Sequence, residues 1–198
     1  YCYELTSINF ANINTSSVTT MDLMFQRCLW LTSIDLRGFD SSKVVSMKSM
    51  FNSCQRLKII DFSKFNTSSV TSMGWMFSKF YEIKTIKFSE KFDTSNVNDM
   101  SFMFLSCNSI TSLNLLHFNT TKVTKMNEMF NNCAKLKYLN ISNFNLININ
   151  SMNEMFDYCN ELQYLDISQI KLKEEHNIYL DFPINNYYFK FSIKDEKK

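Results

Sequence analysis

Residues 54–77 read CQRLKIIDFSKFNTSSVTSMGWMF, and this stretch carries the pattern that decides the fold. Its last two residues form one of six Met-Phe pairs, which follow one another at steps of 26, 26, 27, 26 and 26 residues. The six pairs are Met24-Phe25, Met50-Phe51, Met76-Phe77, Met103-Phe104, Met129-Phe130 and Met155-Phe156. Periods of about 20–50 residues are typical of solenoids, in which each repeat buries its apolar face against its neighbours. The period therefore predicts one array over residues 1–170, with six full repeats and a partial seventh.

Two kinds of apolar spacing share each repeat. Ile60-Asp61-Phe62 alternates apolar and polar residues, as a short half-buried strand does. Val70, Met73 and Met76-Phe77 follow one another at spacings of three and four, which favours a helical or 3₁₀ segment with one buried side. Phe65-Asn66-Thr67-Ser68 lies between them and has the short polar side chains of a turn. We therefore expect an α/β or β-rich solenoid with one parallel β-sheet and short helical or 3₁₀ segments on its other side.

The repeat frame ends after Gln169. Residues 171–175 are polar, and two β-rich runs then flank Pro183-Ile184-Asn185-Asn186. This arrangement predicts a β-hairpin over residues 178–193. Residues 171–198 are thus expected to form a C-terminal cap over the last repeat, with a disordered charged tail.

Composition excludes several classes of protein. Lys and Arg number 21 against 19 Asp and Glu, so the net charge of +2 favours neither nucleic acid nor an anionic membrane as a partner. No run of about 18 apolar residues occurs, and we expect no membrane insertion of this segment. The chain begins at Tyr1 with no leader sequence, which suggests a mature or truncated piece.

The cysteines and histidines do not form a reactive pattern. Six cysteines occupy one position of the repeat, which favours buried free thiols over disulfides or zinc ligands. The two histidines, His117 and His176, have no paired nucleophile, and neither glycine belongs to a phosphate-binding loop. We therefore expect no catalytic residues, no metal and no cofactor. Asn-x-Ser/Thr motifs begin at Asn14, Asn66, Asn119 and Asn140, and their glycosylation depends on export through a eukaryotic secretory pathway.

The outward side of the predicted strands is the remaining candidate surface. Its columns contain polar residues together with two tyrosines on adjacent repeats, and exposed aromatic rings beside polar groups favour partner binding. The alternative is that Asp and Asn columns only keep the strand face soluble. The candidate residues are Asp35, Arg37, Asp61, Lys87, Asn114, Tyr138, Asn140, Tyr164 and Asp166.

The chain resembles the BspA-type leucine-rich repeat. Residues 51–62 carry its F-x-x-C-x-x-L-x-x-[IL] pattern, and residues 92–100 carry the F-[DN]-T-S-x-V-x-x-M variant found in surface proteins of mollicutes, lactobacilli and protists. Phe80 departs from the pattern at a Cys position, as does Leu146-Ile147 at the usual Thr-Ser position. The resemblance covers about residues 1–170 and implies a curved, right-handed, non-enzymatic solenoid used in adhesion and protein binding.

Two functions remain open at this point. The first is a surface or secreted module that binds a protein or glycan partner. The second is an intracellular scaffold subunit of a large protist assembly, with reduced cysteines and unmodified asparagines. An enzyme is the least favoured class.

Overall fold

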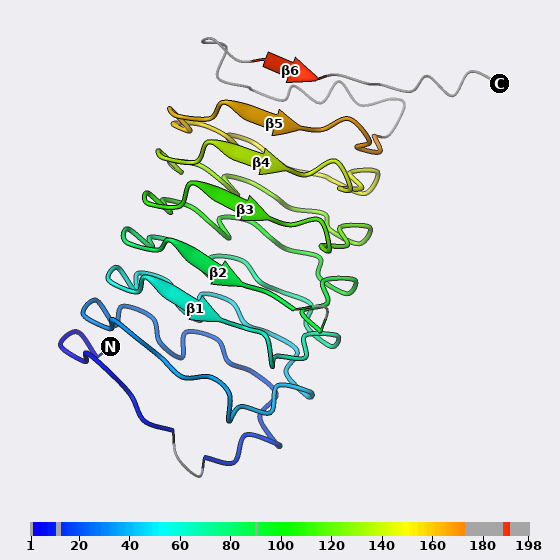
Figure 1. The fold of residues 1–198 in the computed structure, drawn as a ribbon. Helices are drawn as coiled ribbons and strands as arrows, with labels where there is room; N and C mark the ends of the chain where they lie inside the picture. Colours follow the sequence, from blue (N-terminus) through cyan, green and yellow to red (C-terminus); the bar gives the residue numbers. More distant parts are fainter. Residues whose placement is uncertain (1, 11–12, 90, 173–187, 191–198) are drawn as a thin grey trace.

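The computed structural model describes residues 2–10, 13–89, 91–172 and 188–190. Figure 1 shows successive repeats of the chain lying one above the next, each contributing one short strand. The six strands are β1 (Ile59–Asp61), β2 (Thr85–Lys87), β3 (Ser112–Asn114), β4 (Tyr138–Asn140), β5 (Tyr164–Asp166) and β6 (Tyr188–Lys190). In β1 and in β3–β5 the middle residue is buried and its neighbours are more exposed, as the alternating sequence predicts.

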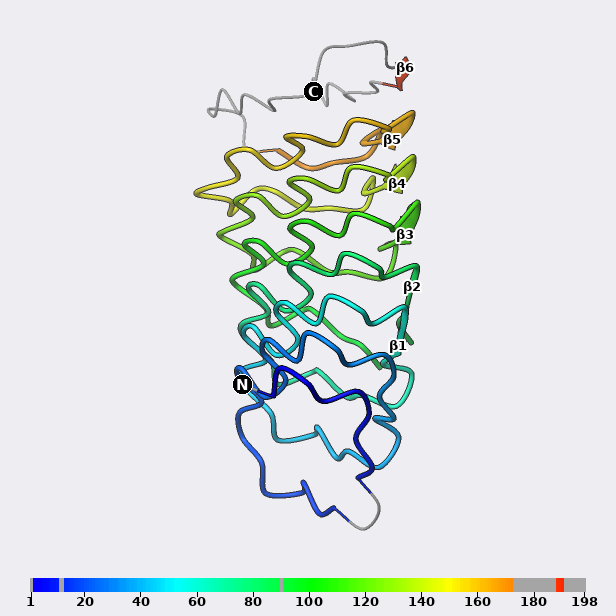
Figure 2. The same ribbon diagram turned by 90° about the vertical axis from the view of Figure 1, so that its left-hand side faces the viewer.

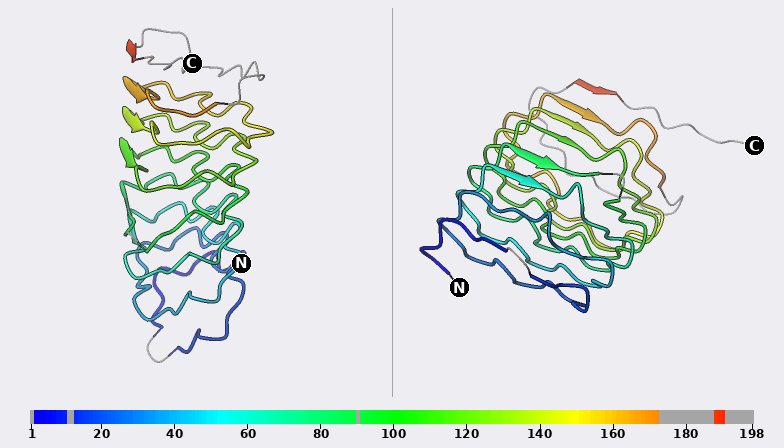
Figure 3. Two further views of the ribbon diagram at one scale, coloured as in Figure 1. Left: turned by 90° about the vertical axis from the view of Figure 1, so that its right-hand side faces the viewer. Right: turned by 60° about the horizontal axis from the view of Figure 1, so that its bottom comes forward.

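The strands pair in parallel, which confirms that part of the expected fold. They form two sheets rather than the single sheet expected, with orders β1-β2 and β3-β4-β5-β6. Equivalent residues are direct partners, as in the pairing of Leu139 with Leu165. The gap between β2 and β3 coincides with the one 27-residue step in the period. In the side views, the strands lie along one side of the stack (Figures 2 and 3).

The predicted helical segments are wrong for the part of the chain that the structure describes, where no helix occurs. Each Met-x-x-Met-Phe-x-x-Cys segment forms two consecutive turns instead. In the second repeat, the Met50 N–H donates to the Met47 carbonyl at 3.2 Å, and the Cys54 N–H donates to the Phe51 carbonyl at 3.0 Å. The third residue of each turn, Ser49 or Ser53, has a positive φ of 55° or 64°. Two turns of this kind bury the same side chains as a helix with spacings of three and four, so the spacing alone did not distinguish them.

The hydrogen bonds between repeats explain why turns replace a helix. The N–H groups of Met47, Ser49, Phe51 and Ser53 donate to carbonyls of the next repeat at 2.8–3.1 Å. A helix directs these groups to its own carbonyls, whereas the turns leave every second N–H available to the neighbouring repeat. The same direction of donation recurs in the later repeats, for example from Phe104 to Met129 at 2.9 Å.

A buried hydroxyl ladder explains the Thr or Ser of the turn motif. The Thr94 hydroxyl donates to the Asn119 carbonyl at 2.9 Å and accepts from the Asn119 N–H at 2.8 Å. Hydroxyls at the equivalent position make the same donation to the next repeat; these residues are Thr15, Ser41, Thr67 and Thr120. All five are nearly or fully buried. Each hydroxyl therefore links two repeats inside the core.

Columns of identical side chains fill the space between the strands and the turns. The Phe104 ring stacks on Phe130 with centroids 5.6 Å apart, and Phe130 stacks on Phe156 at 5.7 Å. Each of four buried cysteines donates its thiol to a phenylalanine carbonyl of an earlier repeat, as Cys133 does to Phe104 at 3.2 Å. The cysteines are free, five of them buried, and Phe80 is fully buried at the equivalent position. The Met, Phe and Cys positions are thus packing positions.

The C-terminal predictions concern residues that the structure describes only in part. Most of the predicted hairpin over 178–193, and the charged tail, lie outside the described residues. Within that range, β6 pairs in parallel with β5, with Phe189 opposite Leu165.

Candidate functional site

All nine candidate residues lie on the outward side of the repeats, and all are exposed or half-buried. Asp35 and Arg37 belong to the repeat before β1, in a segment without a described strand. The other seven lie on β1–β5 at the first or third strand position, in the columns that the repeat predicts. The structure divides the nine into two groups with different chemistry.

The first group, which we call the charged half, consists of Asp35, Arg37, Asp61 and Lys87. The Arg37 guanidinium donates to the Asp35 carboxylate, with an Nη2–Oδ2 distance of 2.7 Å. This hydrogen bond lowers the Asp35 pKa to about 2. Lys87 Nζ lies 3.8 Å from Asp61 Oδ2, and hydrogen bonding from Ser63, then the charges of Lys87 and Arg37, lower the Asp61 pKa. Each charge here already has an opposite charge close to it.

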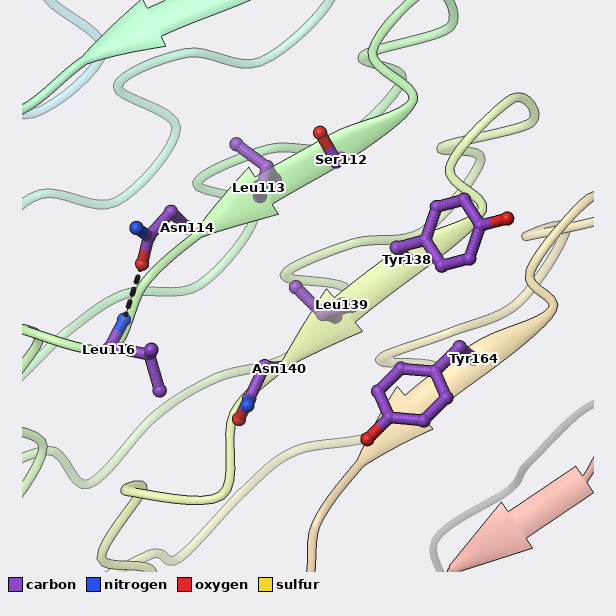
Figure 4. A pocket seen from close by; sticks show the side chains of 8 residues that line it. All are labelled: Ser112, Leu113, Asn114, Leu116, Tyr138, Leu139, Asn140 and Tyr164. Atoms are coloured by element: carbon purple, nitrogen blue, oxygen red, sulfur yellow. Dashed lines mark hydrogen bonds between the residues drawn. The ribbon is translucent and has the colours of Figure 1, made fainter.

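The second group borders a shallow groove of about 350 Å³, which we call the tyrosine groove. Its lining residues are Ser112, Leu113, Asn114, Leu116, Tyr138, Leu139, Asn140 and Tyr164. Figure 4 shows the Tyr138 ring near the beginning of β4, whereas the Tyr164 ring extends along β5 towards its end; the Asn114 and Asn140 amides lie near the ends of β3 and β4. The two tyrosines are direct partners in the parallel register. Tyr138 is 53 % exposed and Tyr164 is 41 % exposed.

The amides of the tyrosine groove are held in fixed orientations by their own turns. Asn114 Oδ1 accepts the Leu116 N–H at 3.2 Å, as the dashed line in Figure 4 shows. Asn140 Oδ1 accepts both the N–H and the hydroxyl of Ser142, at 2.9 Å and 2.7 Å. A side-chain oxygen bound to the backbone two residues later forms an Asx turn, which limits rotation of the amide. Both amides therefore present their NH₂ groups away from the turn.

Asp166 lies at the edge of the tyrosine groove and completes the row of amides. Its Oδ2 accepts from Asn140 Nδ2 at 3.3 Å and from the Tyr164 hydroxyl at 3.4 Å. Its Oδ1 accepts the Ser168 N–H at 3.0 Å. Of the polar and aromatic residues on β3–β5 that line the groove, the candidate list contains Asn114, Tyr138, Asn140 and Tyr164 but not Ser112. Asp166 accepts hydrogen bonds from two of these four, Asn140 and Tyr164.

The sequence prediction omitted Leu116, which forms the apolar end of the groove and is 52 % exposed. In the other repeats its column contains mainly Ser or Arg, as at Ser63, Ser142 and Arg37. An exposed Leu in a polar column was the signal that could have identified it. Leu113 and Leu139 had no such signal, because they are ordinary buried strand residues.

The remaining chemistry of the described residues is limited. They contain no group of three or more His, Cys, Asp or Glu side chains placed to hold a metal ion. In the same ranges, no helix has the length and apolar character required to cross a membrane. The tyrosine groove offers ring faces, amide donors and hydroxyls, which are groups that orient a ligand in a binding site.

Comparison with known proteins identifies a family. No curated protein and no solved structure matched the chain. A family model described as "Mycoplasma protein of unknown function, DUF285" matches residues 2–85 and again residues 78–187. The two matches together extend over most of the sequence, and their succession agrees with the internal repeat. The chain therefore belongs to the DUF285 family, described as Mycoplasma proteins of unknown function.

Proposed function

We propose that the chain is a non-enzymatic leucine-rich-repeat solenoid of the BspA type that is displayed at the cell surface or secreted, and that binds a protein or glycan partner through its strand face. The repeat, the parallel pairing and the family match support this proposal. The observation that carries it is the tyrosine groove, where two exposed rings and fixed amides lie together on the outward side of the strands. Such a combination of aromatic and polar groups is common where proteins bind partners.

The experiment compares the chain with a triple variant. Purified chain is labelled with a fluorophore and applied to intact cells of a species other than the source. Its binding is compared with that of the variant carrying Tyr138→Ala, Tyr164→Ala and Lys87→Ala. All three side chains are exposed, so the variant is expected to fold normally, which its unfolding midpoint verifies. Loss of binding supports the proposal, and unchanged binding of the triple variant contradicts it.

Localisation is tested separately, with an antibody applied to intact and to permeabilised source cells. Surface display predicts labelling of intact cells. In a eukaryotic source, export also predicts glycan mass on Asn66 or Asn119, whose side chains are exposed. Labelling only after permeabilisation contradicts surface display.

One observation favours the second candidate, an intracellular scaffold subunit. Met24 is 41 % exposed, whereas Met50 and Met76 at the equivalent positions are fully buried. Leu23 beside it is 53 % exposed. Exposed apolar side chains of this kind are suited to contact with another subunit. Concentration-dependent association in sedimentation velocity, abolished by Leu23→Lys and Met24→Lys, supports the scaffold, and a monomer at all concentrations argues against it.

A further inference from the structure

The tyrosine groove differs from the rest of the strand face in its charge. Its eight lining residues are Ser, Leu, Asn and Tyr, none of which is charged at neutral pH. The charged half, by contrast, contains two ion pairs within three successive repeats. A ligand of the groove therefore gains little from carrying a formal charge, and an anionic ligand meets the Asp166 carboxylate at the edge.

The groove presents two parallel rows of different chemistry. Tyr138 and Tyr164 occupy one column of the register, with the Tyr164 ring extending along its strand towards the second column, and Asn114 and Asn140 form an amide row (Figure 4). Residues two apart on a strand are separated by roughly 6.6 Å, and neighbouring strands by about 4.8 Å. A ligand that fills this space needs an apolar side for the rings and polar groups along its adjacent edge. A pyranose ring has this form, because its C–H groups gather on one face while its hydroxyls project from its edge.

The amides set the direction of the hydrogen bonds. Because Asn114 Oδ1 already accepts the Leu116 N–H, its NH₂ group is the part with all of its hydrogen-bonding capacity available to a ligand. Asn140 Oδ1 already accepts two hydrogen bonds from Ser142, and its NH₂ group donates one hydrogen towards Asp166. The amide row consequently offers donors, and the ligand must supply acceptors. Sugar hydroxyl oxygens and N-acetyl carbonyls meet this requirement.

We propose that the tyrosine groove is a binding site for a neutral sugar residue of a glycan, with the ring stacked on Tyr138 or Tyr164 and its oxygens accepting from Asn114 and Asn140. This inference rests on the proposed binding function of the strand face and names its ligand class. The fixed amides reduce the entropy lost on binding, since their orientation exists before the ligand arrives. The groove is shallow, so a single sugar binds weakly, and avidity requires several copies of the chain to engage several sugars at once.

The test is an NMR titration of the ¹⁵N-labelled chain with galactose, glucose, mannose and N-acetylglucosamine in turn, and with glucuronic acid as the anionic comparison. The proposal expects saturable shifts of the Asn114 and Asn140 side-chain NH₂ signals and of the Leu116 amide with at least one neutral sugar. Tyr138→Ala is expected to weaken that binding about tenfold or more. Ile59→Ala is the matched control, because Ile59 is 55 % exposed in the same column but outside the groove.

A second pair of variants tests the direction of the hydrogen bonds. Asn114→Asp keeps the oxygen that accepts the Leu116 N–H but removes the NH₂ donor, and is expected to weaken sugar binding about tenfold. Asp61→Asn, at the equivalent position of β1, is expected to leave it unchanged. Equal affinity of Asn114→Asp and the parent chain overturns the assignment of the amide row.

The outcomes separate this inference from the function on which it rests. If no sugar perturbs the groove, but the chain binds cells treated with glycosidases and the triple variant does not, the partner is a protein and the sugar inference fails alone. If the chain binds no sugar and binds neither glycosidase-treated nor untreated cells, both proposals fail. If sugar binding survives Tyr138→Ala and Tyr164→Ala, the site lies elsewhere and the inference is wrong.

Discussion

The buried hydroxyl ladder yields a prediction whose magnitude follows from the structure. Thr94→Val keeps the shape of a fully buried side chain but removes the hydroxyl that serves both backbone groups of Asn119. Each unsatisfied group costs about 1–3 kcal/mol where water cannot replace the lost partner. The two groups of Asn119 together would cost about 2–6 kcal/mol. Because Asn119 itself lies near solvent, we expect the free energy of unfolding to fall by about 2–4 kcal/mol, in the lower part of that range. Urea unfolding followed by circular dichroism measures it.

Two controls separate the hydrogen bonds from packing. Thr94→Ser keeps the hydroxyl and removes one methyl group, at an expected cost of about 1 kcal/mol. Ser78→Ala removes a buried hydroxyl that has no hydrogen-bond partner among the described residues, and is expected to be neutral or stabilising. If Thr94→Val costs no more than Thr94→Ser, the ladder does not link the repeats as described.

Three further predictions follow from the turns, the charged half and the thiols. Glu154 has a φ of 55°, a conformation that Asn adopts readily and a β-branched residue does not. Glu154→Asn is therefore expected to raise the free energy of unfolding by about 0.5–1 kcal/mol and Glu154→Val to lower it. Urea unfolding measures both, and a Val variant more stable than the Asn variant contradicts the prediction. The folded-state pKa of Asp35 is lowered, so its contribution to stability is present above its unfolded pKa and is lost as the pH falls through about 2. An NMR titration is expected to find that low midpoint and its return towards 3.8 in Arg37→Ala, and a normal midpoint in the parent chain refutes the pairing. Cys2 is exposed, whereas burial raises the pKa of Cys54, so alkylation is expected to modify Cys2 rapidly and Cys54 only on unfolding. Mass spectrometry of partly alkylated protein measures this, and early modification of Cys54 contradicts it.

The parallel pairing was predictable because it follows directly from the period. Once Ile60 and its copies are aligned, side-chain alternation fixes which residue of each strand is buried, and identical repeats favour equal register. The turns were not predictable in the same way. Spacings of three and four at Met73 and Met76-Phe77 describe which side chains are buried, and both a helix and two successive turns satisfy them. The choice depends on hydrogen bonds between repeats, such as Ser49 N–H to the Gly74 carbonyl, which a single repeat does not contain.

The candidate site was predictable as a surface but not as a groove. Register placed Tyr138 beside Tyr164 and Asn114 beside Asn140, because both pairs follow from the repeat. Two properties depend on local geometry and were missed. The orientation of the amides is set by the turns that follow the strands, and Leu116 adds an apolar side chain to the lining of the groove. The sequence columns contain both the charged residues and the tyrosines. That the two groups form separate surfaces became clear only from the position of the groove.

Each repeat contains two sets of positions, one that packs against neighbouring repeats and one that forms the outward surface. Positions that recur, such as the buried Met, Phe and hydroxyl columns, make contacts with both neighbouring repeats, so a change in one of them disturbs three repeats at once. Positions that vary lie on the outward strand face, where Ile59 and Tyr138 occupy the same column with nearly equal exposure. A substitution there changes the surface without changing the stacking. Under the proposed function, binding specificity would therefore reside where the repeats differ, and the change from Ile59 to Tyr138 within one column makes the end of the face near β3–β5 a different surface from the end near β1.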